Sequence, residues 1–325
     1  MIDVSIIIPV YNVENFIVRC LNSIVKQKNV VIEILLIDDC STDNSVKVIK
    51  EYVSNLKSNI DINILVNESN KGVSYTRNKG INAAKGKCVY FLDGDDELND
   101  ETSISVLYND IIISQSQISI GEISILKNNK EYYIPYYTNK LNQPYIHNNI
   151  ISHYLKGEWA GVVWNKIIDR KFIIDNELFF YEGLNLGEDE LWSFKAYLNT
   201  SKISFVKQVT YIHYIGENTS SLTNLVVYNY EISKIIMFEI LNILKNKSIS
   251  YNEKPFSEYL KKYIITSVNK KDVNFSNWIS NYKDIRNELI KNKINLIFHP
   301  ILAYIIYQLN LTYLIRRNIR FNSVS

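Results

Sequence analysis

The first hundred residues alternate between short apolar runs and segments whose apolar residues recur every three or four positions. The runs are rich in β-branched residues, so they predict strands, and the first of them is predicted to be buried on both faces, as the strands of parallel sheets are. The predicted strands are residues 4–10, 32–37, 62–66 and 88–92. The intervening helical patterns are carried by Ile17, Leu21, Ile24 and Val25, by Val46, Ile49 and Val53, and by a segment running to about Ala84. Such alternation predicts an α/β fold with a mostly parallel central sheet flanked by helices.

Beyond residue 100 the pattern weakens and predicts fewer elements. Residues 111–113 and 118–125 are apolar enough to predict strands. Further along, residues 203–206 and 209–214 predict two strands, or one strand with a bend at the two polar residues between them.

After residue 226 the spacing of apolar residues becomes helical, which predicts a helical C-terminal extension. Within it, residues 294–315 are strongly apolar and have basic residues on both sides, but Pro300 and two polar residues interrupt them. A membrane-spanning helix needs about 20 predominantly apolar residues, so an interfacial helix on a membrane surface fits better. A helix that completes the core or a dimer interface is the alternative.

Composition narrows the class of protein. With 325 residues, 46% of them hydrophobic, the chain can bury a sizeable core in one large α/β domain plus an extension, or in two domains. The formal net charge of +2 argues against a dedicated nucleic-acid-binding protein. Three cysteines, scattered among predicted core elements, argue for a reducing compartment. Because no signal-peptide pattern is visible, we expect a cytoplasmic protein.

The strand predicted at residues 88–92 ends in a cluster of acids, Asp93, Asp95 and Asp96, with Gly94 among them. Open α/β sheets bind ligands at the carboxyl ends of their strands. Carboxylates packed together repel one another unless a cation lies between them, and a hard divalent cation that carries a phosphate is a common solution. A solvated acidic turn is the alternative.

Two other predicted strands also end in polar residues: Tyr11 follows the first and Asp39 the second. We expect these residues and the acids to lie around one crevice, because they all follow strands of the same sheet. Such an arrangement predicts a nucleotide site. No G-x-G-x-x-G or Walker loop follows the first strand, which argues against the common dinucleotide and P-loop sites. An EF-hand also fits poorly, because its sixth position needs Gly and Leu98 stands there.

Four motifs in this region, in order and spacing, resemble those of family 2 glycosyltransferases with the GT-A fold. They are SIIIPVYN at 5–12, IDDCSTD at 37–43, GVSYTRNKG at 72–80 and FLDGDD at 91–96. The resemblance covers roughly residues 3–220. Cys40 stands where Gly is commoner in the family, and Tyr75 and Thr76 stand where small residues are commoner; none of these positions is expected to do chemistry.

The resemblance implies transfer of a sugar from a nucleotide-sugar to an acceptor hydroxyl, with inversion at the anomeric carbon. Family members carry Glu-Asp at the start of a helix that faces the donor sugar, and Glu188 and Asp189 match that position. Asp189 is therefore expected to be the general base, with Glu188 and Trp192 positioning the acceptor. Asp95, Asp93 and His213 are expected to hold Mn²⁺ or Mg²⁺, although His213 could equally be a packing residue.

The expected nucleotide-binding residues are Pro9, Tyr11, Asp39, Arg77, Asp93 and Gly94. Tyr11 offers a face for base stacking, and Asp39 can accept a hydrogen bond from a ring N–H. A carboxylate paired with an imide N–H fits uracil better than cytosine, so a UDP-sugar is the preferred donor. Arg77 could add positive charge at the phosphates or form a salt bridge to one of the acids.

We expect residues 1–225 to form the catalytic domain, with a nucleotide-binding half at 1–99 and an acceptor half at 100–225. Residues 226–325 would form the helical extension, contacting the inner membrane surface through 294–320. The expected acceptor is a glycan or lipid-linked saccharide in bacterial surface polysaccharide synthesis, and a homo-oligomer is left open. A sugar nucleotidyltransferase and a non-catalytic nucleotide- or glycan-binding subunit are the competing functions.

Overall fold

The structure is a computed structural model that describes residues 1–57, 60–128, 130–134, 145–155, 159–184, 186–218 and 230–247. The chain divides into two compact units, residues 1–150 with 161–225 and residues 151–160 with 226–325. The ten strands found among these described residues all belong to the first unit. The segment 294–320, for which the sequence predicts membrane contact, lies outside the described residues.

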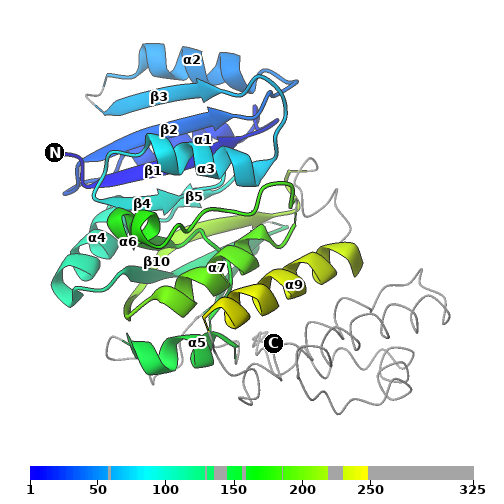
Figure 1. Cartoon of the computed structure of the whole chain (residues 1–325). Helices are drawn as coiled ribbons and strands as arrows, with labels where there is room; N and C mark the ends of the chain where they lie inside the picture. The colour runs from blue at the N-terminus through cyan, green and yellow to red at the C-terminus, as the bar shows by residue number, and fades with distance from the viewer. Residues whose placement is uncertain are drawn as a thin grey trace. The chain divides into compact units, whose positions relative to one another are not determined.

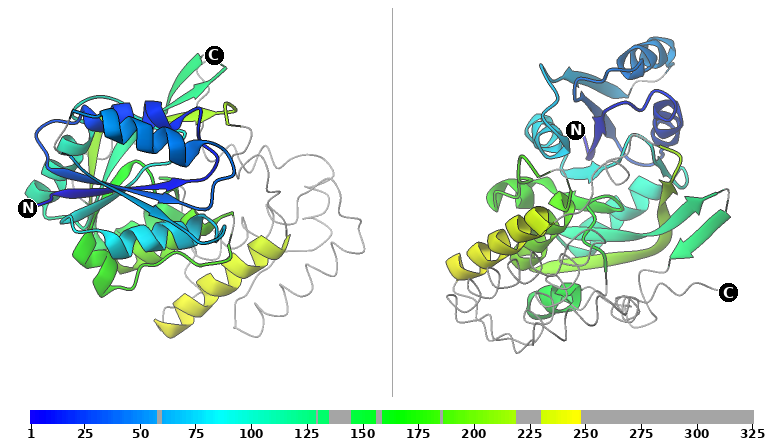
Figure 2. Two further views of the ribbon diagram at one scale, coloured as in Figure 1. Left: turned by 90° about the horizontal axis from the view of Figure 1, so that it is seen from above. Right: turned by 90° about the vertical axis from the view of Figure 1, so that its right-hand side faces the viewer.

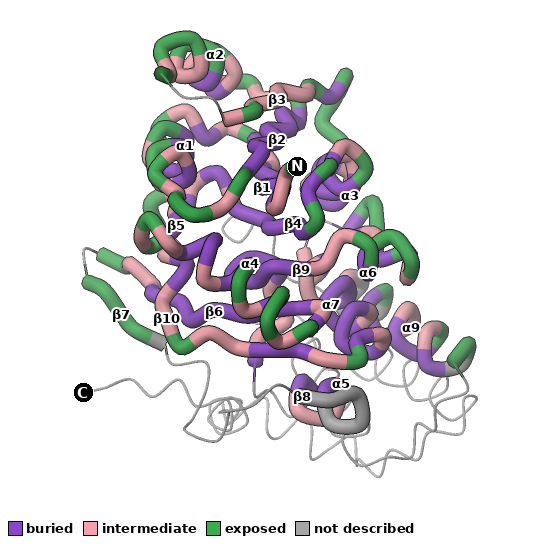
Figure 3. Tube along the Cα trace, turned by 90° about the vertical axis from the view of Figure 1, so that its left-hand side faces the viewer, coloured by how far each residue is buried: buried purple, intermediate pink, exposed green. Residues whose placement is uncertain are grey.

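Four parallel strands form one half of the sheet, and they are the four that the apolar runs predict (Figure 1). In spatial order they are β3 (Asp61–Val66), β2 (Ile32–Asp38), β1 (Val4–Val10) and β4 (Cys88–Phe91). Each pair is in parallel register, so the carboxyl ends of β2, β1 and β4 lie side by side at one edge. Figure 3 shows β1, β2 and β4 as largely buried, whereas β3, at the edge of the sheet, is intermediate or exposed.

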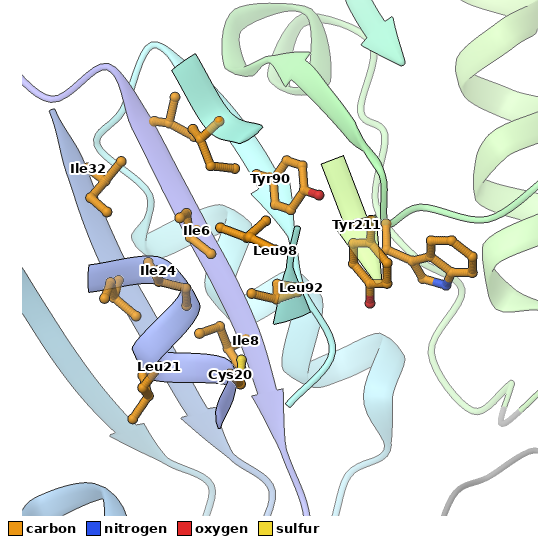
Figure 4. Close-up of a cluster of buried hydrophobic side chains, with 14 of the residues drawn as sticks. Ile6, Ile8, Cys20, Leu21, Ile24, Ile32, Tyr90, Leu92, Leu98 and Tyr211 are labelled. Atoms are coloured by element: carbon orange, nitrogen blue, oxygen red, sulfur yellow. The ribbon is translucent and has the colours of Figure 1, made fainter. Parts of the chain in front are cut away.

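Alternate residues of these strands pack against different helices. Ile6, Ile8 and Tyr90 point to a core shared with α1 (Ile17–Val25), α2 (Ser45–Asn55) and α4 (Ser103–Ser114), as Figure 4 shows for α1. The intervening residues point to the opposite face, which α3 (Val73–Ala83) and α7 (Glu188–Asn199) cover. Figure 2 shows α1 and α3 on opposite sides of the sheet. The two-residue period of the strands therefore produces the three-layer arrangement.

The other half of the sheet is mixed. β9 (Lys166–Asp169) runs antiparallel to both β4 and β6 (Ile118–Lys127), whereas β10 (Lys202–Ile215) is parallel to β6. Short strands pair antiparallel at the margins: β5 (Glu97–Leu98), β7 (Lys130–Ile134) and β8 (Tyr145–Ile146). The predicted parallel pairing therefore holds for the first half, while the second is organised around the reversed strand β9.

One predicted strand is wrong. Residues 111–113 lie in α4, because Ile104, Leu107 and Ile111 share its buried face at helical spacing, whereas Ile112 and Ile113 are exposed. The strand predicted at 118–125 is confirmed as β6. Residues 203–214 form the single strand β10, whose register against β6 shifts between Val206 and Val209, at the predicted bend.

Three further helices complete the described chain: α5 (His147–Leu155), α6 (Arg170–Asp175) and α9 (Tyr230–Asn246). The helical pattern predicted after residue 226 is confirmed in α9, where Ile236, Ile240 and Leu244 are buried. Within the described part of the chain, no helix is both long and apolar enough to cross a membrane.

Candidate active site

A cavity of about 480 Å³ opens at the carboxyl ends of β1, β2 and β4. Because these strands are parallel neighbours, the residues that follow them meet at one edge. The α7 N-terminus and the end of β10 complete the wall. The predicted site residues that line the cavity are Pro9, Tyr11, Asp39, Arg77, Asp93, Gly94, Asp95, Glu188, Asp189 and His213.

The side chain of Arg77, on α3, joins three acids from distant parts of the chain. Its Nη1 donates to Oε1 of Glu188 at 3.0 Å and to Oδ1 of Asp189 at 2.7 Å, while Nη2 donates to Oδ1 of Asp93 at 3.0 Å. Arg77 is only 3% exposed, so removing it would leave the buried Glu188 and two partly buried aspartates without their cation. Of the two roles that the sequence left open for Arg77, the structure supports the salt bridge.

Asp189 lies in the first turn of α7, where the helix dipole favours negative charge. Its Oδ2 also accepts a long hydrogen bond, 3.4 Å, from the main-chain N–H of Val163. Burial raises the pKa of Asp189 to about 7, with Glu188 and Asp93 acting in the same direction and Arg77 opposing them. A carboxylate with a pKa close to neutrality is suited to general-base chemistry.

Asp95 carries a charge that its described neighbours do not neutralise. Its Oδ2 accepts a hydrogen bond from the Asn218 amide at 2.8 Å, and no lysine, arginine or histidine in the described chain forms an ion pair with it. Burial, together with Asp96 and Asp93, raises the pKa of Asp95 to about 6. Carboxylate oxygens with uncompensated charge are what Mg²⁺ and Mn²⁺ prefer, so this donor set fits such an ion. The described residues nevertheless contain no preformed cluster of three such ligands.

His213 is held in an orientation that suits a metal ligand. Its Nδ1 bonds Oδ2 of Asp96 at 2.9 Å, and its ring stacks on Trp164 with centroids 5.1 Å apart. Metal-ligating histidines usually bond a carboxylate or carbonyl through the other ring nitrogen. His213 is thus both a packing residue and a residue that lines the cavity.

Asp96 and Arg19 hold the end of β10 at the cavity. The sequence pointed to Asp96 only as one of the clustered acids, and it did not point to Arg19. Asp96 accepts hydrogen bonds from the Tyr211 hydroxyl at 2.6 Å and the Tyr214 main chain at 2.8 Å, in addition to His213. Arg19 donates to the main-chain oxygen of Asp95 at 2.6 Å and stacks over the Tyr214 ring. These contacts join residues more than 70 positions apart, so local sequence patterns carried no signal for them.

Asp39, directly after β2, mainly holds the loop between β3 and α3. Its Oδ1 accepts from the Asn67 amide and the Lys71 main chain, and its Oδ2 accepts from the Gly72 main chain, each at 2.8 Å. A carboxylate has about four acceptor positions, so one on Oδ2 is left for a ligand N–H. Tyr11, 37% exposed, provides a flat face in the same cavity.

Trp192 does not line the cavity. It is 1% exposed, its Nε1 donates to the Leu178 carbonyl at 2.8 Å, and its ring stacks on Phe180. Trp192 lies about one helical turn after Asp189, and its ring contacts Phe91 of β4, so it packs α7 onto the sheet and does not reach the cavity. The predicted acceptor-positioning role for Trp192 has no support in its position.

Comparison with known proteins agrees with this geometry. The model of the family described as Glycosyl transferase family 2 matches residues 5–172. Poly(ribitol-phosphate) beta-N-acetylglucosaminyltransferase TarS of Staphylococcus aureus is 30% identical over 255 residues, which cover 74% of this chain and 41% of TarS. The matched region therefore covers less than half the length of that relative.

Solved structures share the fold. TarS 1–349 of S. aureus in complex with UDP-GlcNAc superposes with a TM-score of 0.68 at 24% identity, covering 87% of this chain and 80% of that one. The mannosyltransferase PcManGT of Pyrobaculum calidifontis, in complex with GDP-Man and Mn²⁺, superposes with a TM-score of 0.53 at 10% identity. The superposition covers 94% of this chain and 87% of PcManGT. The predicted GT-A-type α/β fold is confirmed.

Proposed function

The chain belongs to glycosyl transferase family 2, and on that premise we propose that it transfers a sugar from a UDP-sugar to an acceptor hydroxyl. The observation that carries this proposal is the single cavity in which Arg77 joins Asp189 and Glu188 to Asp93, with Asp95 beside them. A carboxylate of raised pKa, Asp189, beside acids that could hold a divalent cation supports this reaction.

In this reaction Asp189 removes the proton from the acceptor hydroxyl as the oxygen attacks the anomeric carbon. A single direct displacement of this kind inverts the anomeric centre. Arg77 holds the Asp189 carboxylate in place through Oδ1, and Val163 contacts Oδ2. Glu188 shares the Nη1 group of Arg77, so it fixes the guanidinium beside the base.

The leaving diphosphate gains negative charge, and Asp95, Asp93 and His213 are the residues that would hold a divalent cation near it. Bound there, Mg²⁺ or Mn²⁺ supplies Lewis-acid stabilisation of that charge. Arg77 keeps one oxygen of Asp93 engaged, so the other oxygen of that carboxylate is left for a ligand.

Recognition of the nucleoside rests on Tyr11 and Asp39. Tyr11 stacks on the base, and the remaining acceptor position of Asp39 accepts the imide N–H of uracil. Pro9 and Gly94 line the same cavity without side-chain donors, so they shape the pocket and do not select the base.

Calorimetric titration of UDP, GDP and CMP, each with and without Mn²⁺, tests the donor site. We expect wild-type protein to bind UDP most tightly and to need Mn²⁺, and Asp95→Ala to lose the metal dependence. The matched control is Asp175→Ala, an exposed acid on α6 that only pairs with Lys171. Equal UDP binding by Asp95→Ala and wild type would show that Asp95 holds no metal.

Replacing Asp189, the proposed general base, tests sugar transfer separately from donor binding. Asp189→Asn should keep Mn²⁺-dependent UDP binding but lose about 10²–10⁴-fold in transfer rate, the usual contribution of a general base. The same result argues against a sugar nucleotidyltransferase, which has no need of this base, and against a non-catalytic subunit. Full transfer by Asp189→Asn would remove Asp189 from the mechanism.

We further propose that the acceptor is a glycan or lipid-linked saccharide of a bacterial surface polysaccharide. Support comes from TarS, whose name gives poly(ribitol-phosphate) as its acceptor. Residues 1–225 would act as the catalytic domain, and residues 226–325 would bring it to the inner membrane surface.

A further inference from the structure

Lys166, the first residue of β9, is a buried lysine that the proposed reaction does not use. It is 1% exposed, although lysines are rarely fully buried unless an acid pairs with them. Its Nζ donates to the Val162 carbonyl and to Oδ1 of Asn165, the latter at 3.3 Å. No carboxylate among the described residues forms an ion pair with it.

Both acceptors of Lys166 are neutral oxygens, and the two N–H groups of a neutral amine match them in number, so these hydrogen bonds do not require a charged ammonium. Burial lowers the pKa of Lys166 to about 7, while the charge of Asp189 acts in the opposite direction. The lysine is therefore close enough to the base to sense its charge, although no direct bond joins them.

Residues 161–163 lie between Lys166 and the base. Val162 accepts from Lys166, and the Val163 N–H donates to Oδ2 of Asp189. On α7, one turn beyond Asp189, the Ser193 hydroxyl donates to the Gly161 carbonyl at 3.0 Å. The segment 161–163 is thus fixed to α7 at two points and to β9 at a third.

The sheet end of this connection is rigid. Asn165 has a left-handed backbone, φ 66°, and its amide donates to the Gly121 carbonyl at 2.9 Å. The Gly121 N–H in turn donates to the Asn165 carbonyl at 2.9 Å. Lys166 therefore links a fixed part of the sheet to a loop that has no regular secondary structure.

We propose that Lys166 is a positioning residue that anchors residues 161–163, so that the Val163 amide stays on the proposed base Asp189 and Val162 keeps its place in the cavity wall. This inference rests on the proposed function, because it assigns Lys166 a role through Asp189. It goes beyond that function by naming a residue that touches neither nucleotide nor acceptor.

Lys166→Met tests the proposal, because methionine fills a similar volume without an N–H donor. We expect UDP binding with Mn²⁺ to change less than twofold and kcat to fall about 10- to 100-fold, the size of effect that a small misplacement of a reacting group produces. The acid limb of the pH–rate profile should also move to higher pH, because the Val163 N–H favours the charged form of Asp189.

Lys202→Met is the matched control. Lys202 also donates its Nζ to a main-chain carbonyl, that of Ser114, but it lies away from the cavity. Its replacement should leave the pH–rate profile unchanged. An unshifted limb and an unchanged kcat in Lys166→Met would overturn the proposal and leave Lys166 as a core residue.

Ser193→Ala provides a second test should Lys166→Met fail to fold, since it removes the other side-chain link to residues 161–163. The limb should move in the same direction, and an unmoved limb contradicts the proposal. Failure of the proposed function is distinguishable: Asp189→Asn would then retain transfer. If Asp189→Asn is inactive while Lys166→Met is fully active, only the role of Lys166 is refuted.

Discussion

Among single residues, Arg77 has the largest influence on the charge of the site. One guanidinium contacts Asp93, Glu188 and Asp189, and three carboxylates around one cation leave an excess of negative charge. That excess, together with burial, keeps Asp189 from becoming a strong acid despite the arginine beside it. The same contacts that hold the base in place therefore leave it basic enough to take a proton.

The transfer rate should depend on the ionisation of Asp189. Only the deprotonated carboxylate accepts a proton, so kcat/KM should rise with pH and level off above about pH 7. Burial raises the pKa of Asp189 most, Glu188 on α7 and Asp93 after β4 act in the same direction, and Arg77 on α3 and the Val163 N–H oppose them. Initial rates at saturating Mn²⁺ between pH 5.5 and 9 measure it.

Saturating metal is needed because the pKa of Asp95, about 6, makes metal binding compete with protons. In Arg77→Met the rise of kcat/KM should move to higher pH than in wild type, since the guanidinium favours the charged form of Asp189. A flat profile across this range is the outcome that contradicts the role of Asp189.

The same carboxyl group should cost stability at high pH. Its pKa is higher in the folded protein than the ordinary 3.8, so the folded state holds the proton more tightly. Stability from this group is present below about pH 4 and is lost as pH rises to about 7. Asp189→Asn should therefore unfold at a higher temperature than wild type at pH 8, with a smaller difference at pH 5.

Thermal unfolding of both proteins at the two pH values measures this effect. Asp175→Asn, on the exposed surface of α6, is the control and should match wild type at both. A lower melting temperature for Asp189→Asn at pH 8 contradicts the prediction.

Sequence alone located most residues of the site but not their connections. Tyr11, Asp39, Asp93 and Asp95 could be predicted because each follows an apolar strand, and parallel strands end at one edge. The partners of Arg77 could not be chosen from the sequence, because two of them lie more than 110 positions away. Lys166 gave no signal, since a lysine beside an apolar run reads as exposed.

For single elements, the close contact between α3 and the sheet gives a sharp prediction. A Cβ on Gly80 would lie 2.4 Å from Cγ2 of Ile7 on β1. Gly80→Ala should therefore destabilise the fold, because an overpacking cost of about 1–3 kcal/mol outweighs a helix-propensity gain of about 1 kcal/mol. Urea denaturation measures the change.

Asn82→Ala serves as the control for Gly80→Ala, because Asn82 is an exposed residue of the same helix. It should be neutral or slightly stabilising. Equal stability of Gly80→Ala and Asn82→Ala would mean that α3 does not pack closely on β1.

Elements were predictable where one pattern dominated. The runs at β1 and β2 could be assigned because they are buried on both faces and bounded by polar residues. The three isoleucines at 111–113 were misassigned because only Ile111 is buried, and the helical spacing with Ile104 and Leu107 decides the structure. The reversed strand β9 has only four residues, too few for its direction to be inferred from periodicity.

For the whole molecule, the sequence of the C-terminal segment predicts attachment to anionic membranes. Residues 294–320 combine apolar residues with basic ones, each worth about 1 kcal/mol near an anionic surface. In sedimentation with phosphatidylglycerol vesicles, the full chain should bind, and binding should weaken as salt rises. A chain ending at residue 293 should stay in the supernatant; equal binding by the two contradicts the prediction.

The wide spacing of the partners of Arg77 has a consequence for biosynthesis. Asp93 leaves the ribosome only 16 residues after Arg77, whereas Glu188 follows after 111. At a translation rate of 5–20 residues per second, about 6–22 s pass between synthesis of Arg77 and synthesis of its last two carboxylate partners. During that interval a nascent chain that has folded its first four strands holds a cation with one carboxylate partner of its three, and it becomes a complete site only when α7 arrives.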